Sequence, residues 1–213
     1  MVIYIFAYTG RQELDELIER HRSILFYGVA GSGKTTMLLT IAKNLCKQDI
    51  CVYISTEGTL HYERIAREHD AYGNTLFSEI YDLDELINTA IFLNMVGIKY
   101  IFVDSINAPY RMRAMDESSI VKQALLISIM IKTVEETNGK LFASAQVRTG
   151  EEGYIEAVGH GMLEYYFDLV VNLGIDGYER YAKIMKPNEK IDIEKKMYFK
   201  ITDKGVEWID KHI

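Results

Sequence analysis

Residues 28–36 read GVAGSGKTT and contain the pattern G-x-x-x-x-G-K-[ST]. The apolar run SILFY precedes the pattern, and the helix-compatible run TTMLLTIAKNLCK follows it. A buried strand, a glycine-rich turn and a helix in this order place backbone N–H groups and a helix N-terminus around phosphate oxygens. We therefore expect an α/β fold built around a nucleotide-binding loop, rather than a turn that merely joins a strand to a helix.

The loop residues have expected roles toward a nucleoside triphosphate and Mg²⁺. The glycines lack β-carbons, so phosphate oxygens can approach the backbone closely. Lys34 is expected to reach the β- and γ-phosphates, and the Thr35 hydroxyl to bind Mg²⁺. The nucleotide-binding residues predicted from the loop are Gly28, Val29, Ala30, Gly31, Ser32, Gly33, Lys34, Thr35 and Thr36.

The composition is that of an ordinary globular chain. Its 213 residues are 48% hydrophobic and include only 2 prolines, with no linker-like stretch, so we expect residues 1–213 to form a single domain. The net charge of −7 argues against a surface that broadly binds nucleic acid. The N-terminal run MVIYIFAY is too short to span a bilayer and is expected to be a strand, so we expect no membrane partner.

The cysteines bear on the cellular compartment. Cys46 is expected at the end of a helix and Cys51 at the start of the next strand, which is a poor arrangement for a disulfide. Two cysteines are also too few for a zinc site. We therefore expect reduced thiols and a cytoplasmic protein.

Strand-like and helix-like runs alternate along the chain. Apolar, β-branched runs predict strands over 49–55, 75–83, 98–104 and 141–147. Helical spacing predicts helices over 60–73, 82–97 and 118–140. The runs at 167–175, 180–186 and 196–201, separated by turn residues, predict antiparallel strands. The expected fold is a mostly parallel central sheet with helices on both faces and antiparallel C-terminal strands.

Polar residues follow three of the predicted parallel strands. Asp104 closes YIFVD, Glu57 follows VYIS, and Gln146 closes LFASAQ. In an open parallel sheet the carboxyl ends of the strands lie beside the phosphate loop. Asp104 then suits Mg²⁺, Glu57 the orientation and deprotonation of a water, and Gln146 the detection of the γ-phosphate. Taken singly, Asp104 could be a helix cap and Glu57 a solvated turn residue; their common location favours the catalytic interpretation.

Three blocks, YISTEGTLHYERIA, IFVDSINAPYR and ASAQV, resemble those of the RecA/RadA recombinases, most closely the RadB group, the short archaeal paralogues of RadA. The resemblance covers nearly the whole chain and implies a RecA-like P-loop NTPase core that binds ATP and Mg²⁺. By matching position it implies the following roles. The catalytic residues are Glu57, Lys34 and Gln146, the metal ligands are Thr35 and Asp104, Arg64 stacks on adenine, and Arg111, Arg113 and Arg148 contact DNA.

Departures from the family pattern limit what the resemblance implies. Ser55 stands where the family has Asp, and Ser144 and Ala145 replace Thr-Asn before Gln146. Neither an N-terminal helical DNA-binding domain nor a Phe-x-x-Ala tether is expected. The second DNA-facing loop, residues 148–161, carries three glutamates, which repel phosphate.

We expect a DNA repair and homologous recombination protein with slow Mg²⁺-dependent ATPase activity and weak binding to single-stranded DNA. The expected partners are single-stranded DNA, a RadA-type recombinase or another recombination protein, and a second copy of the chain. A nucleotide-dependent mediator or adaptor that acts mainly through protein–protein contact remains open. So does a KaiC-like signalling ATPase, although a single Glu57 stands where that group usually has paired acids.

Overall fold

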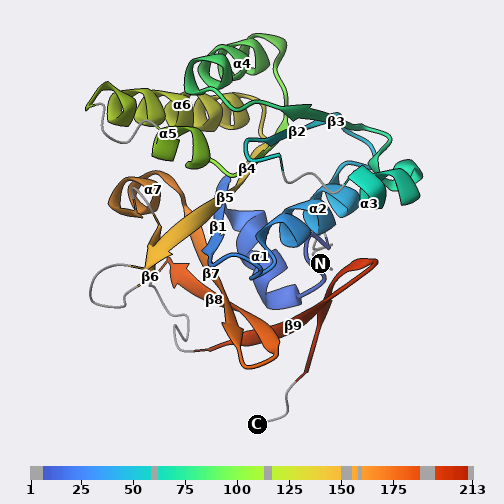
Figure 1. The fold of residues 1–213 in the computed structure, drawn as a ribbon. Helices are drawn as coiled ribbons and strands as arrows, with labels where there is room; N and C mark the ends of the chain where they lie inside the picture. The colour runs from blue at the N-terminus through green and yellow to red at the C-terminus, as the bar shows by residue number, and fades with distance from the viewer. Residues whose placement is uncertain are drawn as a thin grey trace.

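Strands and helices alternate through most of the chain, as the apolar runs predict (Figure 1). The computed structural model describes residues 7–58, 62–112, 117–149, 155–157, 160–187 and 195–210. The helices are α1 (Gln12–Arg20), α2 (Lys34–Leu45), α3 (Tyr62–Arg67), the 3₁₀ helix η1 (His69–Tyr72), α4 (Leu83–Val96), α5 (Ala108–Met112), α6 (Glu117–Glu136) and α7 (His160–Tyr166). The strands are β1 (Ser23–Gly28), β2 (Cys51–Ser55), β3 (Thr75–Glu79), β4 (Tyr100–Asp104), β5 (Lys140–Thr149), β6 (Ile155–Ala157), β7 (Leu169–Asp176), β8 (Glu179–Lys186), β9 (Met197–Thr202) and β10 (Gly205–Trp208).

The sheet has the order β10-β9-β8-β7-β1-β5-β4-β2-β3 within the described residues, and β6 pairs with the far end of β5. The strands from β7 to β3 in this order run parallel, so their carboxyl ends lie at one edge. Strands β8, β9 and β10 extend the sheet in antiparallel pairs. The predicted α/β class, the parallel core and the antiparallel C-terminal strands are confirmed.

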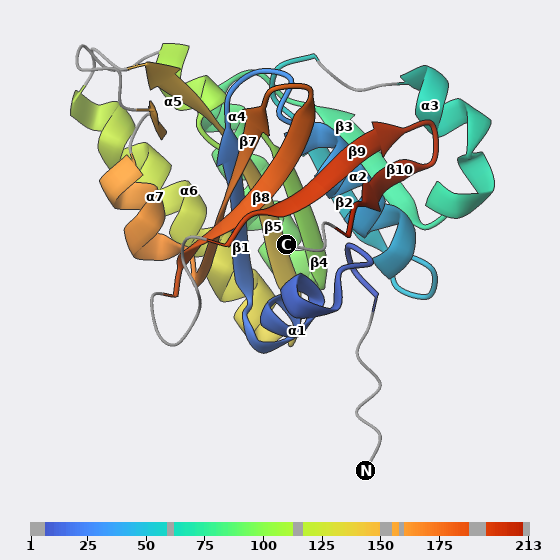
Figure 2. The ribbon, with the colours of Figure 1, turned by 90° about the horizontal axis from the view of Figure 1, so that it is seen from below.

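The strand runs are continuously apolar because both faces of the sheet are covered by helices (Figures 1 and 2). Ile24 and Phe26 of β1 face a core shared with α1 and α2. Leu25 and Tyr27 face a second core shared with α4, α6 and α7. Successive side chains of a strand point to opposite faces, so one short segment contributes to both cores.

Helix α4 begins and ends as its sequence predicts. The Asp82 side chain caps its N-terminus by accepting hydrogen bonds from the backbone N–H groups of Asp84 and Glu85. Gly97 ends the helix with φ 70°, a left-handed conformation that favours glycine. No helix within the described residues combines the length and apolar character needed to cross a bilayer.

Some elements differ from the sequence-based expectation. The predicted N-terminal strand is wrong for Ala7 and Tyr8, which lie outside any strand; residues 1–6 lie outside the described residues. Helix α1 was not predicted, although Leu14 and Ile18, four residues apart, form its buried stripe. Strand β5 extends past Val147 to Thr149 because its last residues pair with β6 instead of β1.

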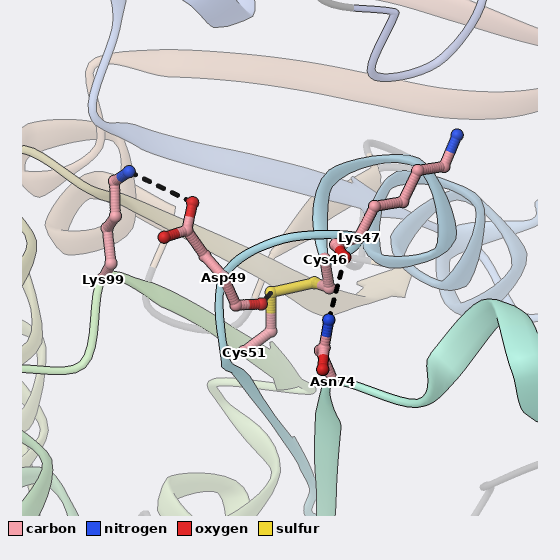
Figure 3. The surroundings of a disulfide bond; sticks show 6 residues. All are labelled: Cys46, Lys47, Asp49, Cys51, Asn74 and Lys99. Atoms are coloured by element: carbon pink, nitrogen blue, oxygen red, sulfur yellow. Dashed lines mark hydrogen bonds and ion pairs between the residues drawn. A yellow bond between two sulfur atoms is a disulfide. The ribbon is translucent and has the colours of Figure 1, made fainter.

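The expectation of reduced cysteines is wrong in the structure, because Cys46 and Cys51 form a disulfide (Figure 3). Helix α2 ends at Leu45, and the following turn returns to β2, which brings the two Cα atoms to 5.8 Å. That separation suits a disulfide. Both cysteines are buried. The bond therefore ties the end of the helix that follows the phosphate loop to the start of β2.

Replacing both cysteines, Cys46→Ala with Cys51→Ala, is expected to lower the free energy of unfolding by about 2 kcal/mol, because the bond restricts the unfolded chain over a short loop. Urea unfolding of the oxidised protein and the double variant measures the difference. The wild type in excess reductant is the matched control and should approach the variant. Equal stability of oxidised and reduced wild type would contradict the expectation.

Candidate nucleotide-binding site

The loop between β1 and α2 requires glycine for conformational reasons at two positions. Gly31 has φ 78°, and Gly33, the N-cap residue of α2, has φ 101°. These values cost free energy in a residue that carries a β-carbon. The glycines that the motif specifies thus also set the path of the loop backbone.

Gly28, the first residue of the motif, lies too close to β7 for any side chain. A β-carbon here would lie 2.0 Å from Leu173 O and 2.8 Å from Ser32 Oγ. Ser32 is fully buried, and its Oγ has no hydrogen-bond partner within the described part of the chain. Ser32 Oγ therefore lies where the loop packs against β7, at the side of Gly28 that no side chain can occupy.

Lys34 begins α2, and its side chain folds back over the loop. Its Nζ donates to Gly28 O at 2.8 Å and to Val29 O at 3.0 Å. Burial lowers the pKa of Lys34, while the carboxylates of Asp104 and Glu57 act in the opposite direction. The structure therefore brings the lysine of the loop within electrostatic reach of both predicted acidic residues.

Asp104 lies buried at the end of β4, between two hydroxyl groups from other strands. Tyr53 of β2 donates from its phenol to Oδ2 at 3.1 Å. Ser144 of β5 donates from Oγ to Oδ1. Burial, and next the charge of Asp104, raise the pKa of the Tyr53 phenol, so it remains a donor. These hydrogen bonds fix the orientation of the Asp104 carboxylate.

Glu57 lies just past β2 and accepts hydrogen bonds from residues at the ends of β4 and β5. Ser105 Oγ donates to Glu57 Oε1 at 2.9 Å, and Gln146 Nε2 donates to Oε2. Glu57 and Gln146, predicted as catalytic residues from separate strands, are thus in direct contact.

The backbone of Gln146 is held by Asn107, a residue that no motif in the sequence marks. Asn107 Nδ2 donates to Gln146 O at 2.9 Å, and Asn107 Oδ1 accepts from Gln146 N at 3.1 Å. Gln146 is also the last β5 residue in the parallel register with β1. Beyond it, β5 pairs with β6, so Gln146 lies between the candidate site and the β5–β6 hairpin.

Thr35 and Thr36 lie in the first turn of α2, half-buried and buried respectively. Thr36 O accepts a hydrogen bond from Thr40 Oγ1. No group of three or more His, Cys, Asp or Glu side chains within the described residues could hold a metal ion. A Mg²⁺ ion bound by Thr35 and Asp104 would therefore need further ligands from phosphate and water.

The structure describes the backbone of some, but not all, of the residues predicted to contact adenine and DNA. Arg64 lies in α3 and Arg111 in α5, the short helix after β4. Arg148 lies in the extension of β5, opposite Glu156 of β6. Arg113 lies outside the described residues. The two loops expected to face DNA thus follow β4 and β5, whose parallel ends carry Asp104 and Gln146.

Strand geometry alone gives the faces on which the polar partners of Asp104 lie, but not that they are its neighbours. Tyr53 and Ser144 lie two residues before Ser55 and Gln146, and residues two apart on a strand share a face. What the sequence lacked was the strand order, which places β4 between β2 and β5. In that order the hydroxyls of Tyr53 and Ser144 lie next to Asp104 and donate hydrogen bonds to its carboxylate.

Comparison with known proteins identifies similar chains. No family model matches the sequence. The curated RadB of Methanocaldococcus jannaschii, described as a DNA repair and recombination protein, is 29% identical over 197 residues, 86% of this chain and 92% of that protein. The RadB of Archaeoglobus fulgidus, described in the same words, is 24% identical over 93% of this chain and 96% of its own length. The crystal structure of the RadB recombinase matches with TM-score 0.78 over 95% of this chain and 99% of that chain at 21% identity, which supports the fold.

Proposed function

We propose, from the premise that this chain is a RadB-like protein of the RecA superfamily, that it acts in DNA repair and homologous recombination as an ATP-binding protein with slow Mg²⁺-dependent ATPase activity. One observation carries the proposal: Glu57 and Gln146, from separate strands, are in direct contact, and the charge of Glu57 acts on Lys34 at the phosphate loop. In this proposal residues 1–213 form a single RecA-like ATPase domain, which the sheet running from β10 to β3 supports. The protein is proposed to be cytoplasmic on its likeness to DNA repair and recombination proteins, since the Cys46–Cys51 disulfide removes the argument from reduced thiols.

The loop suits a nucleoside triphosphate. Gly28 lets the loop lie directly against β7, and the positive φ angles of Gly31 and Gly33 set a glycine-rich turn at the N-terminus of α2, an arrangement suited to phosphate oxygens. The Lys34 ammonium is already placed at the loop and would move its hydrogen bonds from the two carbonyls to the β- and γ-phosphates. In this proposal Arg64 stacks on the adenine base.

Hydrolysis needs a base for water and a counter-charge for the phosphates. Glu57, oriented by Ser105 and Gln146, is proposed to accept the proton of the attacking water. Thr35 and the oriented carboxylate of Asp104 would hold Mg²⁺, directly or through water. Bound there, Mg²⁺ neutralises charge on the β- and γ-phosphate oxygens.

Gln146 is proposed to couple the nucleotide to DNA. Its side chain contacts Glu57, while its backbone leads into the β5–β6 hairpin that carries Arg148. Arg111, Arg113 and Arg148 would then bind single-stranded DNA weakly. A specific observation favours the alternative of a protein–protein adaptor for a RadA-type recombinase: Glu156 lies directly across the strands from Arg148. The sequence of this segment also carries Glu151 and Glu152, and several acidic residues close to Arg148 in the chain disfavour phosphate binding.

Steady-state ATP turnover separates these functions. Turnover that needs Mg²⁺ and rises with single-stranded DNA supports the DNA-dependent ATPase. Turnover that responds to an added RadA-type recombinase but not to DNA supports the adaptor. Absence of both ATP binding and turnover would overturn the proposal. Sedimentation at several protein concentrations tests the further proposal of a homo-oligomer.

DNA binding should depend only shallowly on salt. Each phosphate neutralised on a single strand contributes about −0.7 to the slope of log affinity against log salt, so a site of roughly two or three phosphates gives a slope between about −1.4 and about −2.1. The double variant Arg111→Ala with Arg148→Ala should lose most of the affinity and flatten the slope, and ATP should strengthen binding of the wild type. Fluorescence anisotropy with labelled single-stranded DNA measures both. No binding at low salt, with or without ATP, would favour the adaptor.

A further inference from the structure

The phosphate loop is contacted from outside by the C-terminal antiparallel strands. Arg180 of β8 donates from Nε to Gly31 O at 2.9 Å. On β9, Phe199 and Ile201 reach to 3.2 Å of the position a β-carbon would occupy on Gly33. Figure 2 shows the tip of the β7–β8 hairpin next to the turn between β1 and α2. The loop is thus held at Gly31 by a charged donor and packed at Gly33 by apolar side chains.

The arginine is placed by regular strand pairing. Arg180 lies opposite Ile175 of β7 and Phe199 of β9, so both neighbouring strands fix its backbone. Its side chain is half-buried, and within the described residues no carboxylate forms an ion pair with it. Its hydrogen bond goes instead to the phosphate loop. A long cationic side chain held in this way loses rotamer freedom. The free energy of the charge-assisted hydrogen bond must offset that entropic cost.

We infer that Arg180 is a positioning residue for the nucleotide site, acting through Gly31 to hold the phosphate loop in its binding conformation. Gly31 is exposed, has φ 78° and has open space where a β-carbon would lie, with no atom within 4 Å, so local packing alone does not restrain it. Glycine has the largest conformational freedom to lose on ordering. The hydrogen bond from Arg180 removes part of that freedom before the ligand arrives, which favours binding. This inference rests on the proposed function.

Two measurements on the full chain test the inference. Hydrogen exchange of peptides covering residues 28–36, without nucleotide, should be faster in Arg180→Ala than in the wild type. Titration with a fluorescent ATP analogue should show an affinity about five- to tenfold weaker, as expected for loss of one charge-assisted hydrogen bond. Turnover at saturating ATP should stay within about twofold, because the contact is made before the chemical step.

Two further variants separate positioning from charge and from general stability. Arg180→Lys should recover part of the affinity, since its ammonium can donate to the same carbonyl. Lys200→Ala, on β9, removes a cation that pairs with Glu207 and should behave as the wild type in both measurements. Unchanged loop exchange and unchanged affinity in Arg180→Ala would overturn the inference, as would equal losses in Arg180→Ala and Lys200→Ala. Failure of the wild type to bind the analogue would refute the proposed function, while the exchange measurement still tests the contact.

Discussion

Lys34→Ala is expected to abolish ATP binding while the protein remains folded. The substitution removes the cation that lies over the phosphate loop. The acidic residues whose charges act on the Lys34 ammonium, Asp104 and Glu57, remain. Without Lys34, the triphosphate would face two carboxylates at this edge of the sheet with no lysine between them. Isothermal titration calorimetry should give an affinity at least about 100-fold weaker, or no detectable heat.

The matched control is Lys43→Ala, which removes another lysine from α2. Lys43 pairs with Glu68 at 2.8 Å in the last turn of the helix, away from the phosphate loop, so ATP affinity should not change. Thermal unfolding of both variants checks that the fold survives. If Lys34→Ala bound ATP as tightly as the wild type, the assignment of the phosphate loop would be refuted.

Glu57→Gln should retain ATP binding and lose turnover by at least about 100-fold, the effect typical of removing a general base. The amide oxygen can still accept a hydrogen bond from Ser105 Oγ, and the amide NH₂ at the position of Oε2 requires the Gln146 amide to turn its oxygen toward it. It cannot take a proton from water. Binding affinity and single-turnover hydrolysis, measured on the same preparation, separate the two effects.

Glu79→Gln is the control for this variant, because Glu79 also lies at the carboxyl end of a parallel strand and accepts a hydrogen bond from Tyr81. It should hydrolyse ATP at the wild-type rate. Wild-type turnover in Glu57→Gln would identify Glu57 as an ordinary turn residue and require another base.

The parallel core was predictable because its signals are local. A phosphate-loop motif fixes strand, turn and helix together, and continuous apolar runs indicate strands covered on both faces. The disulfide was not predictable in the same way. Its formation depends on how tightly the turn between Cys46 and Cys51 closes, and helix and strand assignments alone do not give that separation.

The residues of the candidate site also divide into those that local sequence signals predict and those that depend on the tertiary fold. Asp104 and Gln146 could be placed from strand ends, but their partners depend on strand order. Asn107 is an example: its two hydrogen bonds to Gln146 span 39 residues of sequence and exist because β4 and β5 are neighbours. Arg180 depends even more on the tertiary fold, because 149 residues of sequence separate it from Gly31, whose carbonyl accepts its hydrogen bond. Neither residue type nor local spacing marks such contacts.

The order of the strands also determines when the protein can become functional during synthesis. Strand β1, which leads into the phosphate loop, pairs only with β5 and β7 in the described sheet, and these begin at Lys140 and Leu169. A nascent chain that has emerged only as far as α6 therefore has its loop sequence complete but no sheet neighbour to support it. Contacts so distant in sequence form slowly, because a long loop must close first. We therefore expect a ribosome-bound fragment that ends before β5 and β7 to lack the sheet contacts that support the phosphate loop.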